Sequence, residues 1–92
     1  MNIKYNYKVV LEIADNLNDE EREYIEKEIA YEANRFGVEQ HEDGAWYKKG
    51  AFTGKNDFGA VTSFMYFMEK NKPCFNKLEW HSLTDGRIEK AV

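Results

Sequence analysis

The sequence predicts a small, single α+β domain over residues 1–92, with an antiparallel sheet and two helices packed on one face. Two observations support this class. The apolar pattern changes along the chain in the order strand, helix, hairpin, helix, hairpin, with an Asp-Gly pair at each hairpin. The hydrophobic content of 42% is also sufficient for a core in a chain of 92 residues.

The first two elements are a strand and a helix. Residues 4–14 alternate apolar and polar side chains, which is typical of a half-buried strand. Asn18 is expected to cap a helix, with Glu21 three residues later completing a capping box. Gly37 is a natural helix stop. The core side of this helix is predicted to carry Ile25, Ile29, Ala33 and Phe36.

The rest of the chain predicts two hairpins around a second helix. Residues 38–41 and 45–53 flank Asp43-Gly44 and are expected to be strands. After a turn at residues 54–56, Asp57 is expected to cap a helix that ends near Asn71. Its apolar face is predicted to hold Phe58, Val61, Phe64, Met65 and Met68. Residues 78–83 and 87–92 flank Asp85-Gly86 and predict the closing hairpin.

Negative charge is concentrated in and around the first helix. Residues 12–43 hold twelve acids against three bases, a net of −9, whereas residues 44–92 hold five acids against eight bases. Seven of these carboxylates fall within about 21 Å of helix axis, or about one per 3 Å. One strand of B-DNA carries a charge per roughly 3.4 Å, which is a similar density.

A glutamate-rich helix is often only a solvated surface, but here the charge continues beyond both helix ends. A row of carboxylates at this spacing would satisfy the cations of a DNA-binding protein, and a two-fold dimer would lengthen the row. We therefore predict a phosphate-mimicking, partner-binding surface made of Asp15, Asp19, Glu20, Glu21, Glu23, Glu26, Glu39, Glu42 and Asp43.

Other chemistries have weaker support in the sequence. His41 beside Glu42, and Glu79 with His81, are the only acid–base sets, and no nucleophile motif accompanies them, so we expect no enzyme and no catalytic residues. Neither a zinc nor a calcium motif nor a glycine-rich phosphate loop occurs, so no metal and no cofactor is expected. The sequence pI of about 5.2 disfavours direct nucleic-acid binding.

An alternative remains open, in which the chain is a protein-interaction module without mimicry. It would bind a host polymerase or nuclease through an aromatic patch around Trp46, Tyr47 and Trp80. The first residues also lack a long apolar region, so neither an export signal nor a membrane span is expected.

The opening MNIKYNYKVV, the acidic helix NDEEREYIEKE, the length and the acidic pI resemble the small antirestriction (Arn) proteins of T-even bacteriophages, which are DNA mimics. The resemblance implies an early phage protein, a homodimer, in the cytoplasm of the infected bacterial host. It implies that the protein shields phage DNA by occupying a host restriction endonuclease, the modified-cytosine-dependent McrBC nuclease. Because charge mimicry is not very selective, other DNA-binding proteins such as histone-like nucleoid proteins are expected as secondary partners.

Overall fold

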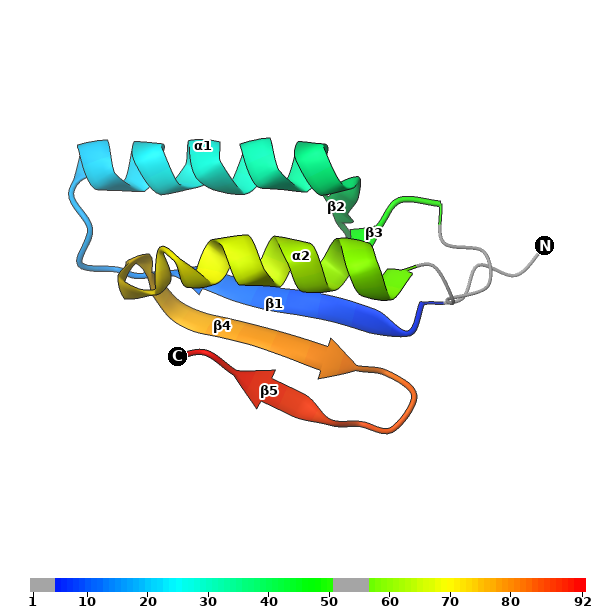
Figure 1. Ribbon diagram of the computed structural model, residues 1–92. Helices are drawn as coiled ribbons and strands as arrows, with labels where there is room; N and C mark the ends of the chain where they lie inside the picture. The colour runs from blue at the N-terminus through cyan, green and yellow to red at the C-terminus, as the bar shows by residue number, and fades with distance from the viewer. Residues whose placement is uncertain (1–4, 51–56) are drawn as a thin grey trace.

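The computed structural model describes residues 5–50 and 57–92 of this chain. Its elements are β1 (Tyr7–Ile13), α1 (Asp19–Phe36), β2 (Val38–Gln40), β3 (Trp46–Lys48), α2 (Asp57–Glu69), a 3-10 turn η1 (Lys72–Cys74), β4 (Phe75–Ser82) and β5 (Ile88–Lys90). The five strands form one antiparallel sheet in the order β2-β3-β1-β4-β5, and both helices lie on the same face of it (Figure 1). The predicted α+β class is therefore confirmed.

The pair formed by β1 and β4 is the centre of the sheet. It runs from Tyr7 opposite Ser82 to Ile13 opposite Phe75, with one register shift near its end. The sequence pattern placed the start of β4 at residue 78, which is three residues too late. The strand begins earlier because β1 continues as far as Ile13, and Phe75 pairs with that residue. Phe75 is only 3% exposed.

Side chains alternate between the two faces of the sheet, as the period-two pattern requires. Val9, Leu78 and Trp80 point toward the helices and belong to the buried core. Lys8 and His81, opposite each other on β1 and β4, point to the other face, which we call the open face. The core thus lies between the helices and one side of the sheet.

The first helix has the predicted ends. The Asn18 side chain accepts a hydrogen bond from the Glu21 N–H at 2.8 Å, and the Glu21 carboxylate accepts one from the Asn18 N–H at 3.0 Å. Gly37 follows the helix with a φ of 69°, in the left-handed region that favours glycine. Ile25, Ile29 and Ala33 are buried as expected, and they pack with α2 and the sheet.

The second helix covers the central strands, and one of its predicted core residues is exposed. Val61, Phe64, Met65 and Met68 are buried, whereas Phe58 is 50% exposed. Phe58 lies in the first turn of α2, where its ring forms T-shaped contacts with Tyr7 and Trp80. In the hairpin before α2, β3 ends at Lys48. The predicted strand over residues 51–53 and turn at 54–56 lie outside the described residues.

A buried carboxylate connects the start of α2 to the start of β1. Asp57, the first residue of α2, has no exposed surface, and its Oδ2 accepts hydrogen bonds from the N–H groups of Asn6 at 2.8 Å and Tyr7 at 3.1 Å. Asp57 was expected only to cap its own helix. Its carboxylate also fixes the N-terminal end of β1 against α2, across fifty residues of sequence.

Replacing Asp57 with alanine is expected to lower the free energy of unfolding by about 2–4 kcal/mol, because two N–H groups lose their acceptor. Asp57→Asn keeps one oxygen acceptor and should cost roughly 1–2 kcal/mol. Urea denaturation measures both. The exposed Glu69→Ala at the other end of α2 is the control and should stay within about 0.5 kcal/mol. Equal losses for Asp57→Ala and Glu69→Ala would contradict this role of Asp57.

Candidate functional site

Four acids of α1 form a stripe along one side of the helix. Asp19, Glu20, Glu23 and Glu26 follow the spacing i, i+1, i+4, i+7, which turns them to one side, and all four are exposed. From Asp19 to Glu26 the helix rises about 10.5 Å, so the three intervals average about 3.5 Å. This matches the roughly 3.4 Å between charges along one strand of B-DNA. We call this stripe, together with the exposed Asp15 in the preceding loop, the acidic row.

Most of the acidic row is not compensated by nearby cations. Glu23 pairs with Lys27 at 2.9 Å, with both side chains largely exposed. Within residues 5–50 and 57–92, Asp19, Glu20 and Glu26 form no ion pair and no side-chain hydrogen bond. In the same part of the chain, no lysine or arginine of the C-terminal half pairs with the row. The row therefore keeps most of its negative charge in solvent.

The remaining acids of α1 lie on its other flank, where they serve local structure. Glu21, which was predicted both for the binding surface and for the capping box, is exposed on this flank and forms the capping box. Glu28 accepts a hydrogen bond from the Tyr24 hydroxyl at 3.0 Å. Glu32 is 6% exposed and contacts Arg35 at 3.3 Å. This flank faces a mixed surface that includes Lys70, so its negative charge is partly offset.

The row continues into a groove between α1 and β1, which we call the α1–β1 groove. It encloses about 490 Å³, and the acids at its rim are Glu12, Asp15 and Glu26, with Arg22 among them. Arg22 donates a hydrogen bond to the Ala14 carbonyl at 3.2 Å. Glu12 was not among the acids predicted for the binding surface. Its place near the end of the strand, three residues before Asp15, could have indicated that it lies close to them. The groove connects the row to Gln40 of β2.

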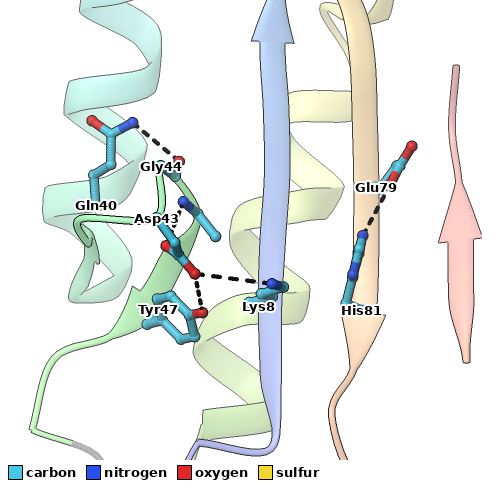
Figure 2. A network of polar contacts seen from close by, with 8 residues as sticks. Lys8, Gln40, Asp43, Gly44, Tyr47, Glu79 and His81 are labelled. Carbon is cyan, nitrogen blue, oxygen red and sulfur yellow. Dashed lines mark hydrogen bonds and ion pairs between the residues drawn. The ribbon is translucent and has the colours of Figure 1, made fainter. Parts of the chain in front are cut away.

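Three further predicted acids lie in or beside the turn between β2 and β3. Glu42 and Asp43 are exposed, Glu39 is half-buried, and all three line one shallow depression with His41 and Tyr47. Figure 2 shows how this turn is held: Asp43 accepts hydrogen bonds from the Tyr47 hydroxyl at 2.6 Å and from the Ala45 N–H at 2.9 Å. Lys8 of β1 reaches the same carboxylate at 3.9 Å. Asp43 is therefore the most strongly compensated of the three.

These contacts change the pKa values of the two partners in opposite directions. The hydrogen bond from the Tyr47 hydroxyl, followed by that from the Ala45 N–H, lowers the pKa of Asp43 below its ordinary value. Burial of the Tyr47 ring, followed by its hydrogen bond to Asp43, raises the pKa of Tyr47 to about 12. Asp43 therefore stays ionised at neutral pH, and Tyr47 stays protonated.

The two histidine sets are separate from each other in the structure. His81 contacts Glu79 at 2.9 Å on the open face (Figure 2), and His41 contacts Glu39 at 3.4 Å while its ring stacks on Tyr47. Each pair comes from one short stretch of chain. In residues 5–50 and 57–92, no three histidine, cysteine or acidic side chains converge as metal ligands would. The geometry offers two separate pairs, of which His81 and Glu79 are hydrogen-bonded and His41 and Glu39 are in contact.

The proposed aromatic patch is not a single exposed surface. Trp80 is 5% exposed on the helix side of the sheet, and Tyr47 is 9% exposed on the open face. Trp46 packs against Phe64 on the helix side. The exposed rings near this end of the core are instead Phe58 and Tyr66 of α2, which line a second groove with Arg87 of the β4–β5 turn.

Comparison with protein-family models, with curated protein sequences and with solved structures found no match for this chain. Among the helices that the structure describes, none is long and apolar enough to cross a lipid bilayer.

The Tyr47–Asp43 hydrogen bond leads to a prediction about pH. Tyr47→Phe should lower the free energy of unfolding by about 1 kcal/mol at neutral pH, and the pKa of Asp43 should rise toward its ordinary value. Because the pKa of Asp43 is lowered in the folded state, its ionisation stabilises the fold at pH values above the unfolded pKa near 4, and this stabilisation is lost as the pH falls through the folded pKa. Because the pKa of Tyr47 is raised in the folded state, its protonated form stabilises the fold below about pH 10, and this stabilisation is lost as the pH rises toward about 12. The difference between wild type and variant should therefore be largest between about pH 5 and 9.

Denaturation at several pH values measures this difference, and carboxyl NMR follows the pKa of Asp43. Tyr31→Phe, which removes an exposed hydroxyl from α1, is the matched control. A Tyr47→Phe variant with an unchanged Asp43 pKa would show that the hydrogen bond is not formed in solution.

Proposed function

We propose that this protein is a DNA mimic that occupies the DNA-binding site of a host restriction endonuclease and so protects phage DNA. The observation that supports it is the acidic row, whose exposed carboxylates on α1 have a mean axial spacing close to that of the phosphates along a DNA strand. The cations of a DNA-binding cleft would meet these carboxylates where they ordinarily meet phosphates. The protein needs no catalysis for this role, only shape and fixed charge.

The identity of the target comes from the resemblance to Arn-type antirestriction proteins. It names the modified-cytosine-dependent McrBC nuclease as the partner, in the cytoplasm of the infected host. A homodimer would place two acidic rows on one particle and extend the imitation of a duplex. Histone-like nucleoid proteins are proposed as secondary targets, because a row of carboxylates discriminates poorly between DNA-binding clefts.

The acidic row lies on one side of the molecule only, and this limits the part of the surface that would imitate DNA. Lys70, Lys72, Arg87 and Lys90 belong to the C-terminal half and lie on or beside α2 and β5, not on the acidic side of α1. We therefore expect a partner cleft to approach from the side of α1 and the β2–β3 turn. The outer side of α2 is expected to remain outside the contact.

The interaction module without mimicry remains the second candidate, with different residues from those first expected. Phe58 and Tyr66 are 50% and 60% exposed on α2 and supply the aromatic surface that Trp46, Tyr47 and Trp80 do not form. If a host polymerase or nuclease bound there, Phe58→Ala would abolish binding and neutralisation of the acidic row would not.

The mimic proposal is tested with two double variants that remove the same charge. Glu20→Gln/Glu26→Gln removes two unpaired carboxylates of the row and should weaken binding to the McrBC nuclease by about tenfold at 50 mM salt. Glu69→Gln/Glu89→Gln removes two exposed carboxylates from α2 and β5 and should change affinity by less than about twofold. Binding to the immobilised protein is the first readout, and cleavage of DNA containing modified cytosine is the second.

Salt and competing DNA complete this test. Affinity should fall at least about tenfold between 50 and 300 mM salt, and duplex DNA should displace the nuclease from the protein. Equal weakening by both double variants would show that only net charge matters. An affinity that hardly changes with salt would overturn electrostatic mimicry.

A further inference from the structure

We propose that the α1–β1 groove binds an extended, basic peptide, which adds as a strand to the free edge of β1. The groove shares Asp15 and Glu26 with the acidic row, but the inference concerns recognition of a peptide backbone by a strand edge, which DNA mimicry does not require. It rests on three features of the groove: an unpaired strand edge, an apolar wall and a negative rim.

The unpaired edge exists because β2 and β3 are short. Each has three residues, and β3 pairs with β1 only at Val9, opposite Trp46. Figure 1 shows β2 and β3 near the C-terminal end of α1 only, so the other half of β1 has no described strand on this side. The residues concerned, Leu11 to Ile13, all line the groove.

The alternation of backbone groups shows which residues present hydrogen-bonding groups at this edge. The Asn6 carbonyl accepts from Leu83, and the Ala14 N–H donates to Cys74, so even-numbered residues of this segment turn toward β4. Odd-numbered residues turn the other way, as the Val9–Trp46 pair shows. The N–H and C=O groups of Leu11 and Ile13 therefore face the groove, where an added strand would pair with them.

The wall of the groove suits one face of such a strand. Leu11 and Ile13 are only partly buried, and Ile29 and Ala30 of α1 stand opposite them in the groove lining. Trp46 of β3 also lines this wall.

The charge of the rim selects a basic occupant. Glu12, Asp15 and Glu26 face a single cation, Arg22, whose guanidinium already donates to a backbone carbonyl. Alternate side chains of an added strand would point toward α1 and toward the open face, where Glu12 lies. Lysine or arginine side chains are therefore complementary to the rim, and valine-like side chains to the wall.

The experiment titrates the full, isotope-labelled chain with the acetylated, amidated heptapeptide Lys-Val-Lys-Val-Lys-Val-Lys and follows backbone amides by NMR. We expect shifts at Leu11, Ile13 and Gln40, with a dissociation constant on the order of 100 µM. Replacing the lysines of the peptide by threonine should weaken binding at least about threefold, and replacing them by glutamate should abolish binding. Replacing the valines by proline should also abolish it, because proline disfavours strand pairing.

Two arginine variants of α1 locate the site. Ala30 is exposed in the groove, and Ala30→Arg should fill it and weaken peptide binding at least about tenfold. Asn34→Arg adds the same side chain one turn later, away from the groove, and should change binding by less than about twofold. Both exposed sites tolerate arginine in a helix, so folding is retained.

The proposal is overturned if Ala30→Arg leaves affinity unchanged, or if the peptide shifts amides elsewhere and not at Leu11 and Ile13. Equal affinity for the lysine and threonine peptides would show that the negative rim does not select a basic peptide. Shifts at Leu11 and Ile13 that depend on protein concentration without any peptide would assign the edge to a second copy of this chain instead. None of these outcomes bears on nuclease binding, so the two proposals fail separately.

Discussion

The pairing of β1 with β4 is the constraint on which the rest of this fold depends. It joins the beginning of the chain to a segment more than sixty residues later, and its register decides which side chains enter the core. A slip of β4 by one residue would turn Leu78 and Trp80 to the open face and replace them in the core with Glu79 and either Lys77 or His81. The two helices pack on the surface that this register creates, and α1 thereby acquires one covered side and one solvated side.

The acidic row is compatible with a stable helix because other interactions offset its repulsion. The capping box and the left-handed glycine satisfy both ends of α1, and the acids of its first turn interact favourably with the helix dipole. Ile25, Ile29 and Ala33 then bury one side against the core. Carboxylates on the solvated side repel one another in water, where screening keeps that cost small. The same carboxylates would interact more strongly with cations inside a partner's cleft, where water is excluded.

Local signals in the sequence predicted the helices and turns well, because capping and glycine conformation depend on neighbouring residues alone. Asn18 with Glu21, and Gly37, are the clearest examples. The early start of β4 and the exposure of Phe58 were missed, because both depend on partners distant in the sequence. A strand extends as far as its neighbour does, and a helical residue is buried only where the sheet lies beneath it.

The site was predictable in composition but not in arrangement. The sequence identified the acids, of which eight of the nine are exposed, and it also predicted the part of Glu21 in the capping box. It missed the α1–β1 groove, which exists only because two strands stop short of the end of β1. The apolar pattern of β1 contains no information about the length of its neighbour β3.

The long separation between β1 and β4 also has a consequence during synthesis. Sixty-two residues separate Ile13 from Phe75, so a ribosome adding about 5–20 residues per second needs roughly 3–12 s before the central pair can close. Throughout that interval the emerged α1 segment has no sheet to cover Ile25 and Ile29. The net negative charge of this segment would oppose the association of neighbouring nascent chains during that interval, in addition to anything it does in the folded protein.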